Sequence, residues 1–312
     1  MLSKSETIIS ILICILLAII IKLNFFNDNN NLDEATYYKE TKSTQTQSEL
    51  IPNTQMYKVI NVIPRKNPTV YTQGLSYYNH TIFESGGLYQ KSSLTHMEWP
   101  SQKIIKKINL EQKYFGEGIS YVLENNILYQ LTYKERDILL YSFPSLEFVK
   151  KIKMVDVMRE GWGLTGGSEP GELYATDGTD KIFVLKIDKR TNELILKNMI
   201  SVTLNMKPVY RLNELVYDGT YVFANIYLEE KIMKINPING QVLNVYDMKP
   251  LIDYELKNGN LTRVRINRGD VLNGITYIPE KKSYILTGKL WNYYYESRRI
   301  ICRIKKDYSW RS

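Results

Sequence analysis

The stretch Tyr114-Phe115-Gly116-Glu117-Gly118-Ile119-Ser120 places one acidic side chain between two glycines, behind an aromatic residue and at the start of a strand-like run. Glycine on each side leaves the carboxylate of Glu117 without bulky neighbours, so backbone or a ligand can approach it closely. A single Gly-Glu-Gly triplet is also what an ordinary turn contains. This triplet differs because its surroundings recur in the chain.

Five segments of this kind follow one another along the sequence. They are Gln73-Gly74-Leu75-Ser76-Tyr77, Glu117-Gly118-Ile119-Ser120-Tyr121, Trp162-Gly163-Leu164-Thr165, Asn213-Glu214-Leu215-Val216-Tyr217 and Asn273-Gly274-Ile275-Thr276-Tyr277. Aligned on their second residues, they are spaced by 44, 45, 51 and 60 residues, close to the period of about 40 to 50 residues of a four-stranded propeller blade. A second strand-like run follows each one, at residues 81–84, 127–132, 172–176, 221–225 and 283–287. The sequence therefore predicts an all-β fold, a five-bladed β-propeller.

A propeller brings equivalent positions of all its blades around one axis. The first position of the repeat holds amide, acid and indole side chains: Gln73, Glu117, Trp162, Asn213 and Asn273. An ordinary core face would carry apolar residues there, so this convergence predicts a functional site at one mouth of the channel. The alternative is that these polar groups merely satisfy one another and channel water.

Composition agrees with a globular β protein. The chain has 312 residues, of which 44% are hydrophobic and 25 are tyrosine, but only 10 are proline, and tyrosine favours strands. Cys14 and Cys302, near opposite ends, leave no plausible internal disulfide. The net charge of +8 comes mostly from lysines spread through turns and strand ends, and in the runs at residues 103–107 and 150–153 these lysines alternate with Ile and Val. We interpret these as solvent-facing strand positions and expect no nucleic-acid partner.

The N-terminal segment is apolar. Residues 7–21 contain almost no polar side chain. This apolar run is slightly shorter than the roughly 20 residues of a membrane-spanning helix, but Lys22 can extend its ammonium group to the membrane interface. We predict a single N-terminal transmembrane helix, an uncleaved signal anchor over residues 1–26; a cleaved signal peptide is the alternative. A flexible polar stem follows over residues 27–56. A single-pass type II arrangement would place the rest of the chain in the lumen of the secretory pathway or outside the cell.

The remaining chain divides into a propeller over residues 57–305 and a basic tail over residues 306–312. The strand-like run Tyr57–Ile63 precedes the first repeat and has no blade of its own. We expect it to form the outermost strand of the last blade, because a propeller needs a latch that closes its ring. We expect a monomer that contacts the membrane only through the N-terminal helix.

Nine motifs in order resemble one known family. They are Tyr71-Thr72-Gln73-Gly74-Leu75, Phe83-Glu84-Ser85-Gly86-Gly87-Leu88-Tyr89, Phe115-Gly116-Glu117-Gly118, Gly161-Trp162-Gly163-Leu164, Thr176-Asp177-Gly178-Thr179, Leu212-Asn213-Glu214-Leu215, Ala224-Asn225-Ile226, Val271-Leu272-Asn273-Gly274-Ile275 and Thr287-Gly288-Lys289-Leu290-Trp291. Together they resemble the plant and bacterial type of glutaminyl-peptide cyclotransferase, a five-bladed β-propeller. The resemblance covers residues 57–295. Each motif alone is weakly specific, whereas nine in order are strongly specific.

The resemblance implies an enzyme that converts the N-terminal glutamine of peptides and proteins to pyroglutamate and releases ammonia. In this reaction the α-amine attacks its own side-chain amide, so one carboxyl group can accept a proton and return it. The resemblance implies Glu117 as this general acid and base, and we expect a raised pKa in an aromatic pocket. Asn213 and Gln73 can bind the amide or polarise its carbonyl. Lys289 would stabilise the oxyanion, pair with Glu117, or only balance the buried acid.

Aromatic residues are expected to form the pocket wall: Tyr71, Phe115, Tyr133, Trp162 and Tyr227. The three tyrosines replace the phenylalanine and two tryptophans of the plant-type motif, so substrate preference is open while the reaction type is retained. Asn225 and Asn273 are further candidate substrate-binding residues. For Asp177, in Asp177-Gly178-Thr179, a hairpin turn is the preferred interpretation.

Metal and cofactor chemistry is not expected. The chain has two histidines, His80 and His96, and no His or Cys pair at ligand spacing, although a structural cation in the channel stays open. One rival is a non-catalytic propeller that binds peptide N-termini or glycans. Another is a propeller hydrolase or lyase, which would ordinarily need a metal or a nucleophile with a His partner.

Overall fold

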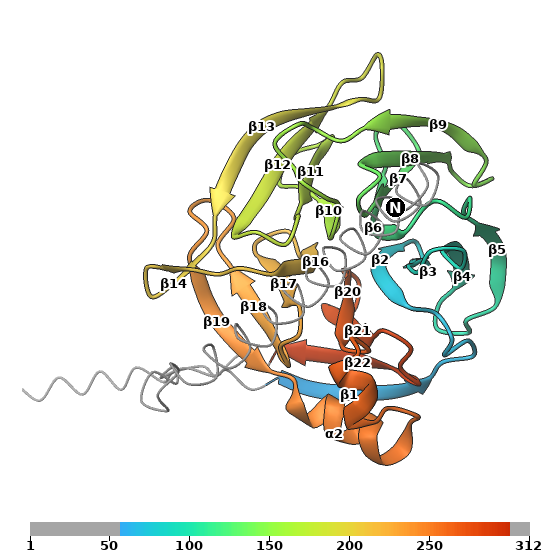
Figure 1. Cartoon of the computed structure of the whole chain (residues 1–312), viewed down its shortest axis with the longest axis vertical. Coiled ribbons are helices and arrows are strands. Elements are labelled where there is room, and N and C mark those ends of the chain that lie inside the picture. The colour runs from blue at the N-terminus through green and yellow to red at the C-terminus, as the bar shows by residue number, and fades with distance from the viewer. Residues whose placement is uncertain (1–56, 300–312) are drawn as a thin grey trace, which may run out of the picture. The chain divides into compact units, whose positions relative to one another are not determined.

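The computed structural model describes residues 57–299, which form five four-stranded antiparallel sheets around a common centre (Figure 1). Blade 1 contains β2 (Thr72–Tyr78), β3 (Thr81–Gly86), β4 (Ser93–Glu98) and β5 (Ile104–Asn109); blade 2 contains β6 (Gly116–Val122), β7 (Ile127–Thr132), β8 (Asp137–Ser142) and β9 (Phe148–Lys153). Blade 3 contains β10 (Leu164–Gly166), β11 (Glu172–Ala175), β12 (Lys181–Ile187) and β13 (Leu194–Ser201); blade 4 contains β16 (Leu212–Tyr217), β17 (Val222–Ile226), β18 (Lys231–Ile235) and β19 (Val242–Asp247). Blade 5 contains β20 (Leu272–Ile278), β21 (Ser283–Gly288), β22 (Tyr293–Arg299) and β1 (Tyr57–Pro64). The predicted five-bladed propeller is confirmed.

The N-terminal strand β1 closes the ring. It pairs antiparallel with β22 from Tyr57 opposite Arg299 to Pro64 opposite Tyr293, and it is the outermost strand of blade 5. Figure 1 shows β1 beside β22, although the two lie at opposite ends of the described chain. The predicted latch is therefore confirmed.

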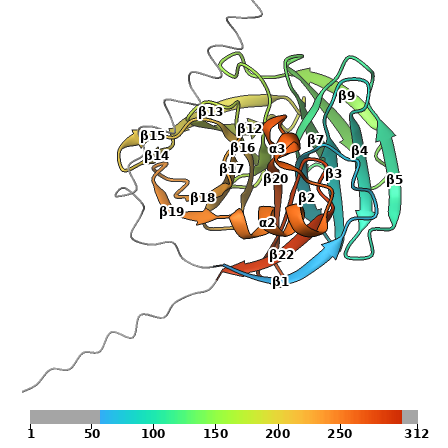
Figure 2. The same ribbon diagram turned by 60° about the horizontal axis from the view of Figure 1, so that its bottom comes forward.

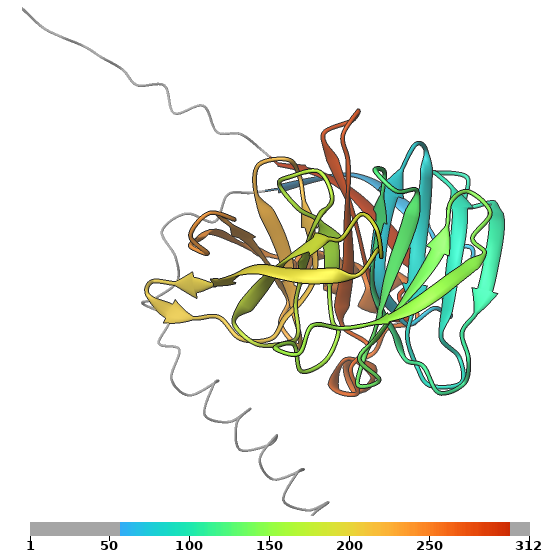
Figure 3. The ribbon, with the colours of Figure 1, turned by 90° about the horizontal axis from the view of Figure 1, so that it is seen from above.

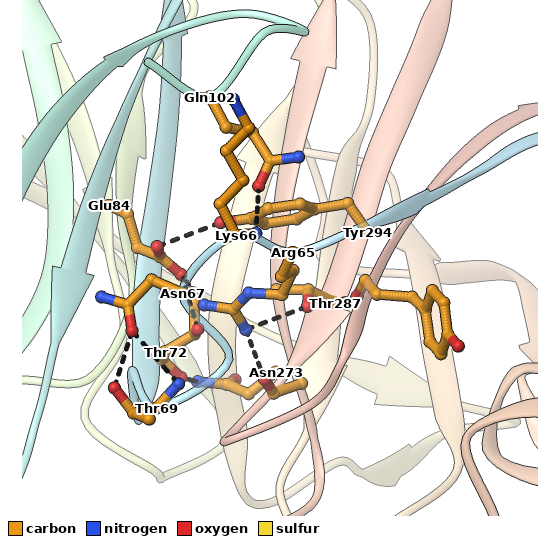
Figure 4. A network of polar contacts seen from close by, with 12 residues as sticks. Arg65, Lys66, Asn67, Thr69, Thr72, Glu84, Gln102, Asn273, Thr287 and Tyr294 are labelled. Atoms are coloured by element: carbon orange, nitrogen blue, oxygen red, sulfur yellow. Dashed lines mark hydrogen bonds and ion pairs between the residues drawn. The ribbon is translucent and has the colours of Figure 1, made fainter. Parts of the chain in front are cut away.

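A buried ion pair reinforces this closure (Figure 4). Arg65, directly after β1, donates from Nη2 to Glu84 Oε1 of blade 1 at 2.6 Å, and their side chains are 0% and 3% exposed. Tyr294 of blade 5 donates to Glu84 Oε2 at 3.0 Å, and the Arg65 guanidinium lies 4.7 Å from the centroid of the Tyr294 ring. Arg65 also donates to Thr287 Oγ1 and to the Gly288 carbonyl. The network thus joins blade 1 to blade 5 and holds the end of β21.

The inner strands approach one another more closely than side chains would allow. A Cβ atom on Gly118 would lie 2.4 Å from the Leu164 nitrogen, and one on Gly163 would lie 2.3 Å from the Asn213 carbonyl oxygen. Cβ atoms in proteins essentially never approach backbone atoms this closely. The recurring second-position glycine is therefore required by the contact between neighbouring inner strands.

The lysine-rich segments, predicted to be solvent-facing strand positions, lie on the outermost strands of blades 1 and 2. The strands β5 and β9 are mostly exposed, whereas every residue of β7 is buried. Apolar side chains of neighbouring blades share buried clusters; one of these contains Leu131 and Leu140 of blade 2 together with Leu173 and Leu185 of blade 3.

Insertions account for the two longer repeat spacings. The hairpin of β14 (Thr203–Leu204) and β15 (Lys207–Pro208) lies between blades 3 and 4, and it projects from the rim in Figure 3. The helices α2 (Lys249–Asn258) and α3 (Arg263–Asn267) lie between blades 4 and 5 (Figure 2). Within residues 57–299, no helix is long and apolar enough to cross a membrane. The predicted anchor, stem and basic tail lie outside the described residues.

Candidate active site

Four of the five first-position residues lie at irregularities in the inner strands. The pairing register shifts between Thr72 and Gly74 in β2, between Gly116 and Ile119 in β6, between Leu212 and Leu215 in β16, and between Leu272 and Ile275 in β20. These intervals contain Gln73, Glu117, Asn213 and Asn273. A bulge bends the strand and changes the direction of its side chains. The recurring irregularity therefore explains why these four polar side chains do not follow the regular alternation of the strand.

The four residues are buried, and three of them form a hydrogen-bonded chain. Gln73 donates from Nε2 to Glu117 Oε1 at 3.0 Å. Asn273 in turn donates from Nδ2 to Gln73 Oε1 at 2.9 Å and to the Thr72 carbonyl at 3.1 Å. Asn273 therefore fixes the orientation of the Gln73 amide, and the amide holds the carboxyl group of Glu117.

The environment of Glu117 favours its neutral form. Its side chain is 4% exposed, and this burial raises the pKa well above its ordinary value. The charges of Glu160 and Glu135 raise the pKa further, while Lys289 and the hydrogen bond from Gln73 oppose the shift. A carboxyl group whose pKa is raised in this way exchanges protons more readily near neutral pH than an ordinary glutamate.

Lys289 follows β21 and is 3% exposed. Its Nζ atom lies 5.0 Å from the ring centroid of Tyr71 and 4.8 Å from that of Tyr227. Burial lowers its pKa to about 8, although the charges of Glu117 and Asp270 act in the opposite direction. Within residues 57–299, Lys289 forms no direct ion pair with Glu117. The cation therefore lies in the field of the acid but leaves its ammonium available to a ligand.

The predicted aromatic wall forms two groups of rings. Phe115 contacts Tyr71 and Tyr133, with ring centroids 6.3 Å and 5.6 Å apart. Trp162 meets Tyr227 edge to face, with centroids 5.5 Å apart. Lys289 lies over Tyr71 of the first group and Tyr227 of the second. The rings therefore surround the cation on two sides.

Comparison with known proteins shows which family the chain belongs to. The sequence model of the family described as glutamine cyclotransferase matches residues 34–298. The chain belongs to the glutamine cyclotransferase family. It is 34% identical over 232 residues to the glutaminyl-peptide cyclotransferase of Arabidopsis thaliana, covering 74% of this chain and 67% of that protein. The crystal structure of the Myxococcus xanthus glutaminyl cyclase superposes with a TM-score of 0.67 at 26% identity, covering 78% of this chain and 96% of that one.

The remaining predicted residues of this glutamine cyclotransferase differ in what they contact. Asn213 is 3% exposed, and its Oδ1 atom has no hydrogen-bond partner within the described residues. Asn225 accepts a bond from the Gly274 amide at 3.2 Å, so its oxygen supports the neighbouring inner strand. Asp177 accepts bonds from the amide and hydroxyl of Thr179, which makes it the turn residue that the sequence favoured.

Three acidic residues near the site were missed by the sequence reasoning. Glu160 lies two residues before Trp162, and together with burial its charge raises the pKa of Tyr133. The Oε2 atom of Glu160 is buried without a hydrogen-bond partner in the described part of the chain. Glu135 accepts bonds from the Tyr89 hydroxyl at 2.8 Å and the Phe115 amide at 3.4 Å. The third, Asp270, follows α3. Glu160 adjoins a quoted motif and could have been found, whereas the other two lie in loops without a pattern.

The insertion that carries α3 also contributes to the mouth of the site. The Gly269 carbonyl accepts a hydrogen bond from the Tyr71 hydroxyl at 3.2 Å. A Cβ atom built on Gly269 would lie 3.1 Å from that hydroxyl and 3.5 Å from the Tyr227 hydroxyl. The hydroxyl groups that distinguish these tyrosines from the plant-type rings thus face the insertion.

No metal cluster is found among residues 57–299, where no three His, Cys, Asp or Glu side chains are placed to hold an ion. His96 stacks on Phe83 with ring centroids 4.4 Å apart and is 3% exposed. His80 lies exposed in the turn between β2 and β3. The expectation that catalysis needs no metal stays a prediction.

Proposed function

We propose that this chain converts N-terminal glutamine of peptides and proteins to pyroglutamate and ammonia, with Glu117 as general acid and base. The observation that carries the proposed mechanism is the buried Glu117, which is held by Gln73 and lies in the field of Lys289, a lysine without an ion pair among residues 57–299. Membership of the glutamine cyclotransferase family supports the reaction type.

The first step binds the cationic N-terminus. Most α-amines are protonated near neutral pH, because their pKa is about 7.7 to 8.0. Glu160 and Glu135 add negative potential beside Glu117, and the unpartnered Oε2 of Glu160 within the described residues is suited to accept a hydrogen bond from the ammonium. We assign Glu160 this binding role.

The second step closes the ring. Ionised Glu117 accepts a proton from the α-ammonium, and the lone pair of the resulting neutral amine attacks the side-chain amide carbon. Negative charge then develops on the amide oxygen, where the Lys289 ammonium stabilises it. The aromatic wall holds the side chain folded back toward its own amine.

The third step expels ammonia. Protonated Glu117 returns its proton to the amide nitrogen, the carbon–nitrogen bond breaks, and the carbonyl of pyroglutamate re-forms. The ring nitrogen still carries a second proton, which the regenerated carboxylate of Glu117 accepts and passes to the departing ammonia, so that the leaving group is released as ammonium. The unpartnered Oδ1 of Asn213, within the part of the chain described, would accept a hydrogen bond from the departing amino group. One carboxyl group thus performs every proton transfer, and no proton is gained or lost overall.

Mass spectrometry of a glutamine-initiated peptide incubated with the full chain tests the proposal. The wild-type protein is expected to reduce the peptide mass by about 17 Da, and Glu117→Gln to lower the rate at least about 10³-fold. Glu135→Gln is the matched control, because it changes a carboxylate at the same mouth and is expected to slow turnover only a few-fold. A peptide that binds without a mass change would indicate a non-catalytic binding propeller.

We also propose that residues 1–26 anchor the protein in the membrane as a single-pass type II protein with the propeller in the lumen or outside the cell. The apolar run at residues 7–21 supports this placement. Carbonate extraction and protease protection of cell membranes test it, since release by carbonate or digestion from the cytoplasmic side contradicts the proposal.

A further inference from the structure

A cavity that is lined in part by Tyr71 lies beside the candidate active site. It has a volume of about 240 Å³, and its lining includes Tyr71, Gly87, Leu88, Lys91, Ser93 and Lys107. The lining comes from blade 1 and from the segment that leads into it. None of the proposed catalytic steps uses this cavity.

The cavity and the active site share part of their walls. The Gly87 amide donates to the Tyr71 carbonyl at 2.8 Å, and both residues line the cavity. A Cβ atom built on Gly87 would lie 2.3 Å from Phe115 Cε1 and 2.9 Å from Gln73 Cγ. Gly87 therefore lies between the cavity and the side chains of Phe115 and Gln73, and Gln73 in turn holds the carboxyl group of Glu117.

The cavity is positively charged, whereas the region around Glu117 that would bind the peptide ammonium is negatively charged. Lys91 and Lys107 are exposed, and no carboxylate lines the cavity with them. Within residues 57–299, neither lysine forms an ion pair. By contrast, Glu135 and Glu160 place negative charge near Glu117. The two regions therefore prefer ligand groups of opposite charge.

We propose that this cavity is a subsite for an acidic side chain at the second or third residue of the substrate peptide. The inference rests on the proposed function, because it places the N-terminal glutamine at Glu117. An extended peptide advances about 3.3 to 3.6 Å per residue, so the residues directly after the glutamine pass the shared wall. The ammonium groups of Lys91 and Lys107, which form no ion pair in the described part of the chain, then attract the carboxylate.

Amidated tetrapeptides test the subsite without a competing terminal carboxylate. Gln-Glu-Ala-Ala, Gln-Ala-Glu-Ala, Gln-Ala-Ala-Ala and Gln-Lys-Ala-Ala amides are compared by kcat/KM, from ammonia release by the full chain. One of the two Glu peptides is expected to exceed the Ala peptide by about three- to tenfold, mainly through a lower KM, as befits partly exposed charge pairs. The preference should decline in 0.5 M salt, where screening is strong.

Reversing the charge of the two lysines tests whether the preference for an acidic peptide arises in the cavity. Lys91→Glu combined with Lys107→Glu is expected to reverse the preference toward the Lys peptide and to leave the Ala peptide within about twofold. The matched control combines Lys103→Glu with Lys106→Glu, which changes net charge equally. Lys106 contacts the Ser145 carbonyl of blade 2 and Lys103 pairs with Glu98, and neither lines the cavity. The control should keep the wild-type preference.

The possible outcomes separate the subsite from the proposed function. Equal kcat/KM values for all four peptides with the wild-type protein would refute the subsite while leaving the reaction intact. Loss of the preference in the control variant would attribute it to net charge rather than to the cavity. Failure of the wild-type protein to cyclise any peptide would instead refute the proposed function.

Discussion

Lys289 allows a quantitative test of the proposed oxyanion stabilisation. Burial lowers its pKa to about 8. About nine in ten molecules therefore carry the Lys289 charge at pH 7, and only about one in ten at pH 9. If the charged ammonium stabilises the oxyanion, kcat should decrease about tenfold between these two pH values.

Lys289→Met should abolish this pH dependence along with most of the activity. Methionine fills a similar volume between the Tyr71 and Tyr227 rings, but it carries no charge. Losing one preorganised donor to an oxyanion lowers kcat by about 10² to 10³. The cation also opposes the raised pKa of Glu117. Its removal should make Glu117 harder to ionise and move the ascending limb of the pH profile to higher pH.

The assay measures ammonia release at saturating peptide from pH 5 to pH 10. It reports kcat rather than kcat/KM, because the free substrate amine titrates at about 7.7 to 8.0 and would dominate the second quantity. Lys134→Met is the matched control: Lys134 lies 5.0 Å from the centroid of the Tyr133 ring but is exposed. A wild-type kcat that stays constant from pH 7 to pH 9.5, or a loss below about tenfold in Lys289→Met, would refute the role.

Two further predictions concern stability. Arg65→Met leaves the buried carboxylate of Glu84 without its cation and should lower the free energy of unfolding by about 3 to 5 kcal/mol. Lys103→Met, at an exposed ion pair, is the control and should change it by less than about 0.5 kcal/mol. Urea unfolding measures both, and a loss below about 1 kcal/mol for Arg65→Met would contradict a stabilising role of the Arg65–Glu84 ion pair. Burial lowers the pKa of His96 in the folded state, so its contribution to stability is intact above the unfolded pKa of about 6.5 and declines as the pH falls. Between pH 7 and pH 5, the wild-type protein should therefore lose more of its free energy of unfolding than His96→Leu, and equal losses would argue against a buried neutral imidazole.

The repeat in the sequence predicted the centre of the site because the same local geometry recurs in each blade. Gln73, Glu117 and Asn273 come from repeats up to 200 residues apart, yet they form one hydrogen-bonded chain. Equivalent positions of a closed ring must meet at its axis. Alignment of the repeats was therefore sufficient to place these side chains together.

The periphery of the site could not be predicted in the same way. Glu135 and Asp270 lie in loops, and the insertion with α3 interrupts the repeat. Their positions depend on how those loops pack against the rings of the wall, which no sequence period encodes. The ion pair between Arg65 and Glu84 was missed for a related reason, since the two residues meet only after β1 has closed the ring.

The departure from the repeat at Glu214 also has a structural explanation. The other four repeats carry glycine at this position, but Glu214 is 0% exposed and its Oε1 accepts a hydrogen bond from the Leu75 amide at 2.9 Å. Its Oε2 atom has no hydrogen-bond partner within the described residues. The carboxyl group thus joins the inner strand of blade 4 to the inner strand of blade 1. Four blades contribute a glycine where strands must approach closely, and the fifth contributes a side chain that satisfies a backbone amide of blade 1. The exception to the repeat therefore supports the same inner ring from which Gln73, Glu117, Asn213 and Asn273 project.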